Sequence, residues 1–437
     1  MNRIYAYVLI LCLCLNLMAC SSATGTNSTS ETNQAPVSTP FSVVANLRPL
    51  QTADGWVYGA SSEDGFYSIA SLCRNDGSSN IQFTDYHTME TVYLCAQINC
   101  SHSNDTCTSW VPYSGSGTSL MVVGDRLLLV APGDPYSTDE EPVVPKISAC
   151  ELDGTQRTQI AEFKANQELD GPFMTDDESL FATLRTATNE GWSAEFVRID
   201  LMSGQCDSII TLDTKKEEVV FDACDEYLFL RTIEEQDKDD VASYNTIARY
   251  FKLNINTMQR DLLGEFSTDE YRLMPLENVL AIYSKSNNTV ELLDFISGEY
   301  KTVAENLLTP GQEMLDLNMI YYDQGRLLVS TVPLGPETKT LTREFFVINC
   351  DDGDISKTDL FYTVDGRDLP VYPIAEIVEE NSYFVIANEK MQQYEPQRED
   401  GTSYYISSYE PDYGKISYDD FWNGTAGTVK METRVIR

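Results

Sequence analysis

The sequence predicts an all-β protein, a β-propeller of about seven blades, with six or eight blades as the alternatives. Three observations support this prediction. A strand–turn–strand unit recurs along the chain, polar and turn-forming residues recur at fixed places within it, and a second, apolar strand precedes each copy. A repeat made only of strands cannot cover its own apolar faces, so several copies must stack around an axis.

The recurring unit is clearest at residues 196–209, FVRIDLMSGQCDSI. Phe196 and Ile199 favour a strand. Asp200 supplies a side-chain acceptor, and Gly204 supplies a position with positive φ, where the backbone must reverse. Related segments occupy residues 83–94, 148–160, 251–263, 291–303, 346–359 and, less cleanly, 405–418. Together these segments predict seven hairpins.

Two positions anchor the hairpins in register. A polar residue recurs, and four positions later stands a glycine or methionine, in the pairs Asp85 and Met89, Asp200 and Gly204, Asn254 and Met258, Asp294 and Gly298, and Asn349 and Gly353. Most steps between the anchors are about 40 to 55 residues, close to the roughly 40 to 50 residues of a four-stranded blade.

A propeller must also close its ring and protect its last strand edge. The apolar strands that precede the hairpins include residues 123–130 and 222–230, each announced by a polar turn. We expect either Phe41–Leu47 or the terminal Val429–Ile436 to supply the closing strand.

The first nineteen residues are predicted to lie outside the fold. Arg3 gives a short positive region, residues 4–18 are apolar, and Leu17-Met-Ala precedes Cys20. This segment resembles a bacterial lipoprotein signal peptide. The resemblance implies cleavage before Cys20 and lipidation of its thiol. A plain signal peptide or an amino-terminal membrane helix is the alternative, although the apolar run is shorter than the ~20 residues needed to span a bilayer.

The predicted order after the signal peptide is a tether and then one domain. Residues 20–40 comprise the lipidated cysteine and a Ser/Thr-rich stretch with almost nothing to bury, which predicts a flexible tether. Residues 41–437 form the propeller domain. We therefore expect a protein that is anchored to the cell membrane and faces the extracytoplasmic side.

The charge balance restricts the partners. The chain has 30 Lys and Arg against 68 Asp and Glu, a formal net charge of -38. Such a surface repels nucleic acid and anionic lipid head groups. We therefore expect no nucleic-acid partner and membrane contact only through the lipid anchor. Residues 351–354, DDGD, are predicted to form a hairpin turn, and the chain contains no EF-hand calcium loop.

The strongest local motif is the segment 93–107, YLCAQINCSHSNDTC, with the spacing C-x4-C-x-H-x4-C. It has three interpretations. A structural disulfide is favoured outside the cytoplasm, and the third thiol would then need Cys73 or another distant partner. A tetrahedral structural zinc site would use all four donors, Cys95, Cys100, His102 and Cys107. A free, redox-active thiol is the third interpretation.

This segment also resembles a group of lipoproteins from Firmicutes that have a TolB- or WD40-like β-propeller. In that group a strand ending in Leu-Cys is followed by an Asn-Cys-x-His-x4-Cys signature, which matches residues 94–107 here. Ile98 stands where the group commonly has proline. The resemblance implies a propeller and an extracytoplasmic location, and it implies no chemistry.

Histidine scarcity argues against an enzyme that uses a catalytic triad. The chain has only His87 and His102, and it lacks a G-x-S-x-G elbow. We expect His87 to be a solvent-facing turn residue. The four tryptophans are expected to pack between blades rather than to stack on sugars: Trp56, Trp110, Trp192 and Trp422.

The favoured function is a binding module for an extracellular peptide, glycan or protein. Propellers suit this role because loops on one face converge while the blades hold them still. The longest polar loops, residues 132–146, 234–244 and 392–402, are the first candidates for the binding surface. The alternative is an extracytoplasmic carbohydrate-active hydrolase that uses two carboxylates at the propeller mouth.

Overall fold

The computed structural model describes residues 44, 46–50, 59–70, 74, 77–112, 117–136, 143–236, 245–276, 278–308, 313–334, 343–394, 406–424 and 428–434. The predicted signal peptide, Cys20 and the tether lie outside these residues, as do Trp56 and Cys73. No described helix is both long enough and apolar enough to cross a membrane.

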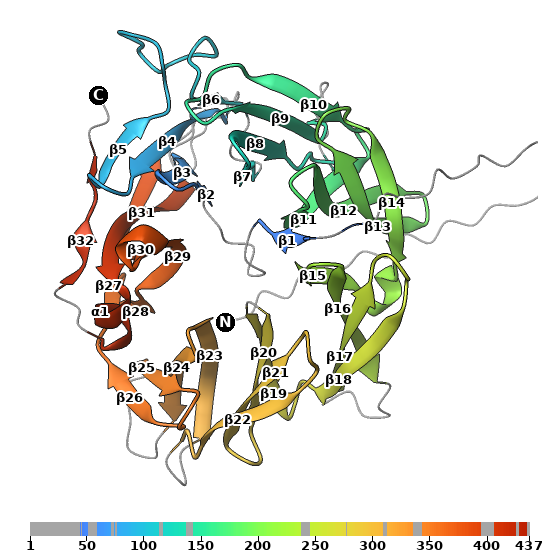
Figure 1. Ribbon diagram of the computed structural model, residues 1–437, viewed down its shortest axis with the longest axis vertical. Helices are drawn as coiled ribbons and strands as arrows, with labels where there is room; N and C mark the ends of the chain where they lie inside the picture. The colour runs from blue at the N-terminus through green and yellow to red at the C-terminus, as the bar shows by residue number, and fades with distance from the viewer. Residues whose placement is uncertain are drawn as a thin grey trace, which may run out of the picture. The chain divides into compact units, whose positions relative to one another are not determined.

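The domain is all-β and consists of seven blades, as predicted, which follow one another around a ring in chain order (Figure 1). Within each blade, successive strands pair antiparallel. The first four blades comprise β2 (Gly59–Ser61), β3 (Gly65–Ile69), β4 (Ser79–Asp85) and β5 (Glu90–Tyr93); β7 (Ser119–Val123), β8 (Arg126–Ala131), β9 (Lys146–Glu151) and β10 (Thr158–Glu162); β11 (Gln167–Thr175), β12 (Ser179–Thr188), β13 (Gly191–Asp200) and β14 (Cys206–Leu212); and β15 (Val219–Cys224), β16 (Tyr227–Gln236), β17 (Asn245–Asn254) and β18 (Arg260–Ser267).

The remaining blades comprise β19 (Tyr271–Leu276), β20 (Val279–Ser284), β21 (Thr289–Asp294) and β22 (Tyr300–Glu305); β23 (Glu313–Asp323), β24 (Arg326–Leu334), β25 (Glu344–Asn349) and β26 (Ile355–Thr358); and β29 (Tyr372–Ile377), β30 (Ser382–Tyr394), β31 (Ile406–Ser417) and β32 (Lys430–Met431). Short additions are β6 (Trp110–Val111), the hairpin of β27 (Phe361–Val364) and β28 (Arg367–Pro370), the 3-10 turns η2 (Thr214–Lys216) and η3 (Val378–Glu380), and α1 (Tyr418–Trp422).

The two predicted anchor positions have the expected turn geometry. Asp200 Oδ1 accepts from the backbone N–H of Ser203 at 2.7 Å and from its hydroxyl at 2.8 Å. Four positions after each polar anchor the backbone is left-handed, with φ of 62° at Met89, 72° at Gly204, 58° at Met258, 73° at Gly298 and 79° at Gly353. Each anchor pair therefore lies in the turn between the third and fourth strands of its blade. The turn predicted for residues 351–354 is one of them.

The seventh predicted copy, residues 405–418, is wrong. Residues 406–417 form one continuous strand, β31, and the chain turns only at α1. Gly414 does not have a positive φ here, and an added Cβ would lie 2.5 Å from Val429 Cγ1. This glycine permits close packing against the neighbouring segment rather than a turn.

The carboxyl-terminal segment closes the ring, as one of the two alternatives predicted. β33 (Thr433–Arg434) pairs parallel with β5 of the first blade. The buried Glu432 carboxylate accepts from the Thr91 hydroxyl and from Arg434 Nε. The segment that joins the last blade to the first is thus held by charge-assisted hydrogen bonds.

The other alternative, closure by Phe41–Leu47, is wrong for the residues described. Leu47 exchanges two backbone hydrogen bonds of 2.9 Å with Asp225, and β1 (Arg48–Pro49) pairs with β11. Leu47 is 1% exposed and lies in an apolar cluster between the third and fourth blades. Burial of this side chain therefore directs the segment inward, away from the edge of the ring.

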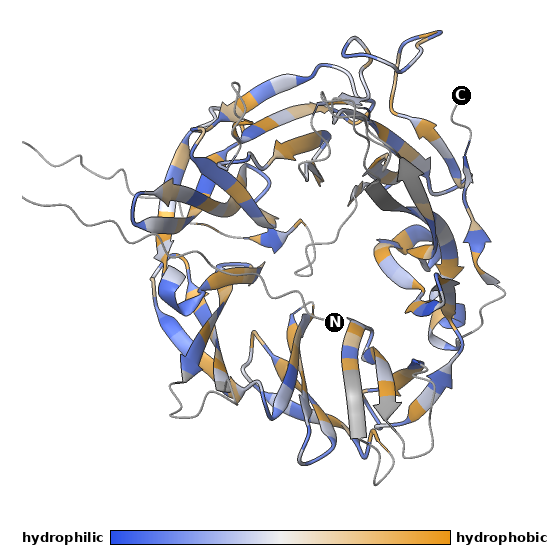
Figure 2. Ribbon diagram, turned by 180° about the vertical axis from the view of Figure 1, so that it is seen from behind, coloured by the Kyte–Doolittle hydropathy of each residue, from blue (hydrophilic) through white to orange (hydrophobic). Residues whose placement is uncertain are grey.

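Apolar clusters between neighbouring blades form the core. Orange and blue residues alternate along many blade strands in Figure 2, as expected for strands with one face against a neighbour. Phe229 of the fourth blade stacks on Phe295 of the fifth at 5.0 Å between ring centroids. Trp422 is 4% exposed and packs against Tyr383 and Phe421, which confirms the predicted interior role for this tryptophan.

Candidate functional site

The first candidate site is the loop between β5 and β6. Leu94 is buried at its start, which fixes where Cys95 emerges from the first blade. Asn99 and His102 have φ of 60° and 53°, so the backbone adopts the left-handed conformation twice within four residues. The loop thereby folds back on itself and brings Cys107 toward Cys95.

The four predicted donors are brought together. The Sγ atoms of the three cysteines and a ring nitrogen of His102 all lie within 4.8 Å of one another. His102 Nδ1 lies 3.3 Å from Cys107 Sγ. An ion with metal–sulfur bonds of ~2.3 Å would hold tetrahedral sulfurs about 3.8 Å apart. The group could therefore hold a metal ion after small side-chain adjustments.

The cysteines of this loop are free thiols in the structure. A disulfide would require a sulfur–sulfur distance of about 2.05 Å and would use only two of the donors. Burial raises the pKa of the Cys107 thiol. At Cys95, burial is outweighed by hydrogen bonds from the Gln97 backbone and the Thr108 hydroxyl, which lower the pKa of that thiol.

A second layer of contacts fixes the loop to the first blade. Ser109 Oγ lies 3.0 Å from Cys107 Sγ, and Asn80 Nδ2 donates to Ser109 Oγ at 2.8 Å. Arg74 donates to the carbonyl of His102 and stacks 4.4 Å from the ring centroid of Trp110. Groups around ligand residues orient them and tune their affinity for a metal.

The loop also reaches the second blade. Arg157, which precedes β10, donates to the carbonyls of Thr108 and Trp110. Closing the loop with a metal would therefore stiffen the junction between the first two blades. His87, by contrast, lies in the first hairpin turn with its side chain 94% exposed, which confirms the prediction that it is a turn residue.

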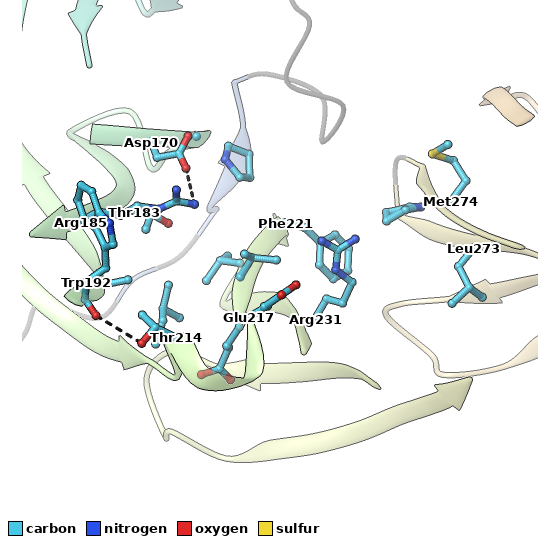
Figure 3. A pocket seen from close by; sticks show the side chains of 18 residues that line it. Asp170, Thr183, Arg185, Trp192, Thr214, Glu217, Phe221, Arg231, Leu273 and Met274 are labelled. Carbon is cyan, nitrogen blue, oxygen red and sulfur yellow. Dashed lines mark hydrogen bonds and ion pairs between the residues drawn. The ribbon is translucent and has the colours of Figure 1, made fainter. Parts of the chain in front are cut away.

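The second candidate site is a pocket of about 750 Å³ that lies mainly between the third and fourth blades (Figure 3). It is lined by β11, β12, β13, β14, the η2 turn, β15, β16 and the inner strand β19 of the fifth blade. The lining combines aromatic and apolar side chains with a few charges: Asp170, Arg185, Trp192, Leu212, Glu217, Glu218, Val219, Phe221, Arg231, Leu273 and Met274, among others.

Two of the three pocket carboxylates are committed to arginines. Asp170 Oδ2 lies 2.7 Å from Arg185, an ion pair drawn in Figure 3. Glu218 is buried, pairs with Arg260 at 2.6 Å and accepts from the Asp213 N–H at 2.8 Å. These contacts fix the two carboxylates in place as part of the pocket wall.

One pocket-lining residue, Trp192, belongs to an aromatic pair. Trp192 is the second residue of β13, the third strand of its blade, and its indole N–H donates to the Tyr136 hydroxyl at 2.8 Å. The two rings are 5.5 Å apart in an edge-to-face arrangement. Tyr136 belongs to the loop 132–146, one of the three predicted binding loops.

The other predicted loops are only partly described. In the loop 132–146, residues 137–142 lie outside the described part of the chain; the same holds for residues 237–244 and 395–402 of the second and third loops. Glu234, at the start of the second loop, pairs with Arg249 and Lys216.

Sequence reasoning missed the pocket residues, although two signals were present. Arg231 directly follows the apolar run YLFL, residues 227–230. Trp192 directly follows the turn Asn189-Glu190-Gly191. A polar residue is more usual at such a position next to a turn. The expectation that Trp192 packs between blades is incomplete, because this side chain also lines the pocket.

Comparison with known proteins finds matches only among solved structures. No protein-family profile matches the chain, and no curated protein matches it. An oligogalacturonate lyase in complex with manganese is 12% identical, with 84% of this chain and 90% of that chain covered and a TM-score of 0.40. A polysaccharide lyase of family PL25, an ulvan lyase bound to -[GlcA(1-4)Rha3S]-, is 8% identical over 90% and 94% of the two chains, with a TM-score of 0.40.

The periplasmic gluconolactonase of Pseudomonas aeruginosa is 11% identical, with 80% of this chain and 98% of that chain covered and a TM-score of 0.36. The likeness is one of fold. The seven blades of this chain are defined by its own strand pairing.

Proposed function

We propose that the protein is a lipid-anchored binding protein of the extracytoplasmic face, and that the pocket between its third and fourth blades holds the ligand. The observation that carries this proposal is the pocket itself, about 750 Å³, with aromatic and apolar walls and charged groups of both signs. Ligand sites have volumes of roughly 300 to 1,000 Å³ and combine an apolar lining with a few placed polar groups.

The proposed location of the protein is inferred from its amino-terminal residues. The apolar segment 4–18 and Cys20 support an anchored lipoprotein, and the tether 20–40 would hold the domain away from the bilayer. Metabolic labelling with a fatty acid should mark the wild-type protein and leave the Cys20→Ala variant unmarked. Labelling of both proteins, or of neither, would contradict the anchor.

The contacts in the pocket favour binding over hydrolysis by two carboxylates. The carboxylates of Asp170 and Glu218 each pair with an arginine, so these two groups are held in the pocket wall rather than free to contact a substrate. Hydrolysis would need a general acid and a second carboxylate at a defined separation. Incubation of bound oligosaccharides with the protein, followed by product analysis, tests this alternative directly.

We also propose that zinc occupies the group formed by Cys95, Cys100, His102 and Cys107. Three thiolates and an imidazole are the donors that tetrahedral zinc prefers, and four protein ligands leave no open position for a substrate. The metal would therefore stabilise the loop rather than catalyse a reaction. A disulfide within the loop and a free redox-active thiol are the competing outcomes.

Array binding tests the proposed function. The soluble domain, residues 41–437, is applied to glycan and peptide arrays as wild type, as Trp192→Ala and as Met202→Ala. Met202 is 90% exposed and follows the opposite end of β13 from Trp192, so it serves as a matched control. We expect wild-type binding to at least one ligand class, unchanged in Met202→Ala and weakened about tenfold or more in Trp192→Ala. No wild-type binding, or equal binding by both variants, would refute the proposal.

A further inference from the structure

Arg231 stands apart among the arginines of the third and fourth blades. Each of the other four has an ion pair with a carboxylate: Arg185 with Asp170, Arg198 with Asp176, Arg249 with Glu234 and Glu265, and Arg260 with Glu218. Within the part of the chain that the structure describes, no such pair is found for Arg231. This is unexpected in a chain that has 68 acidic side chains.

The guanidinium of Arg231 is also partly desolvated. The side chain is partly buried, and its Nε is buried with no hydrogen-bond partner among the described residues. Proteins rarely bury part of a cation without a negatively charged partner, because the lost hydration must be replaced.

The position of Arg231 is fixed by its neighbours on both sides. In the sheet it lies between Val219 of β15 and Tyr250 of β17. Burial raises the pKa of Tyr250, and the charge of the Arg231 guanidinium and its hydrogen bond to the Tyr250 hydroxyl oppose that rise. Tyr250 is 1% exposed, so its ring is rigidly held. The cation is thus placed in the pocket wall without a negative partner.

The surroundings of Arg231 limit which anion could enter. Glu217, Glu218 and Asp170 also line the pocket, and they would repel a dianion such as phosphate more strongly than a monoanion. A planar carboxylate matches the fork of guanidinium N–H groups. The remaining wall is largely apolar and includes Phe221 and Met274. A ligand that suits this wall has one carboxylate and an apolar face.

We propose that the pocket binds a small monocarboxylate, with its carboxylate on Arg231 and its apolar face against Phe221 and Trp192. This inference rests on the proposed function, because it assumes that the pocket is the binding site. Two sources supply this chemistry: a sugar acid, whose ring has an apolar face, and an acylated amino acid. Both would present the same group to Arg231.

The test compares each acid with its neutral counterpart. Calorimetric titration of the wild-type soluble domain uses galacturonate against galactose, N-acetyl-leucine against N-acetyl-leucinamide, and inorganic phosphate. We expect one acid to bind at least about tenfold more tightly than its neutral counterpart, and phosphate to bind more weakly than that acid. The pair that shows the preference identifies the source. This comparison needs no variant, so it remains decisive if a substitution prevents folding.

Two substitutions then locate the preference. Arg231→Gln should abolish the preference for the acid, whereas Arg272→Gln should keep it. Arg272 is exposed and lies on β19, so its replacement removes the same charge outside the pocket. An acid preference that survives Arg231→Gln would overturn the inference, as would tighter binding of phosphate.

The outcomes separate this inference from the proposed function. If an array ligand binds and depends on Trp192, but neither acid is preferred over its neutral counterpart, the pocket is the binding site and the carboxylate inference fails. If the wild-type protein binds no array ligand and none of the probes, both fail.

Discussion

The indole nitrogen of Trp192 lies 2.8 Å from the hydroxyl oxygen of Tyr136, and this hydrogen bond joins a loop of the second blade to a pocket-lining residue of the third. Tyr136 is 71% exposed, so it contributes little to the core. Its position instead determines how one edge of the Trp192 ring is presented.

Substitutions at Tyr136 should separate ring contact from hydrogen bonding. Tyr136→Ala loses both, and we expect ligand binding to weaken several-fold, by about 1 kcal/mol, with almost no change in stability. Tyr136→Phe keeps the edge-to-face contact and should bind nearly as tightly as wild type. Titration with an array ligand and urea unfolding measure both effects. A large loss of stability in Tyr136→Ala would show that the loop has a structural role.

Metal removal should destabilise the first two blades. A strong chelator, or Cys107→Ser, should lower the free energy of unfolding by about 3 kcal/mol or more, because ligand binding to the folded state contributes directly to folding. Cys206→Ser is the matched control, since Cys206 is exposed and lies outside the cluster.

Native and denaturing mass spectrometry with thiol alkylation provides the readout for the metal. We expect one zinc per chain, which is lost on denaturation. Cys95, Cys100 and Cys107 should resist alkylation in the native protein and react after denaturation. Thiols that are protected in pairs without metal would establish the disulfide interpretation instead.

Acid should weaken the hairpin turns. At Asp200 the Ser203 N–H and hydroxyl lower the pKa of the carboxyl, and at Asp85 hydrogen bonds from Thr88 do so despite partial burial. A lowered folded-state pKa gives stability above the unfolded pKa, near 3.9, that is lost as pH falls through the lower folded value.

The double variant Asp85→Asn/Asp200→Asn should therefore lose less stability than wild type between pH 5 and pH 2, because asparagine keeps the acceptor oxygen without titrating. Asn254 and Asn349 occupy the same turn position in other blades. Urea unfolding at several pH values measures how the free energy of unfolding changes with pH. The same pH dependence in the variant and the wild type would contradict this explanation.

Two glycines whose φ angles differ by 1° should respond differently to replacement by alanine. Gly204 has φ 72°, and an added Cβ would lie 2.2 Å from the carbonyl oxygen of Ile160 in the second blade. Gly298 has φ 73°, but its nearest atom would be 3.7 Å away. We expect Gly298→Ala to cost about 1 kcal/mol through backbone strain alone.

Gly204→Ala should cost more, about 2 to 4 kcal/mol, since it adds a clash with backbone atoms of the neighbouring blade. Chemical denaturation of both variants gives the difference. Equal losses of stability would mean that the two blades move apart to admit the methyl group.

Features encoded locally could be predicted from sequence. The hairpins follow from a polar residue and a left-handed position four residues apart, as at Asp200 and Gly204, and the donors Cys95 to Cys107 lie within one loop. The false hairpin at 405–418 contains Gly414; glycine is common in turns, but the structural role of this one is close packing. Local sequence does not distinguish these two roles.

The pocket depends on long-range packing and was not predicted. Trp192, Arg231 and Met274 come from three different blades, and only the curvature of the ring places them around one cavity. Likewise, Leu47 could not be assigned to the third and fourth blades, because the apolar cluster that receives it is assembled from distant strands.

Hydrogen–deuterium exchange with and without an array ligand tests most directly whether the pocket is the binding site. We predict slower exchange in residues 167–194 and 212–232, which carry the third- and fourth-blade walls, with little change in the first, sixth and seventh blades. Protection confined to the first, sixth or seventh blade, with residues 167–194 and 212–232 unchanged, would contradict the assignment of this pocket as the binding site.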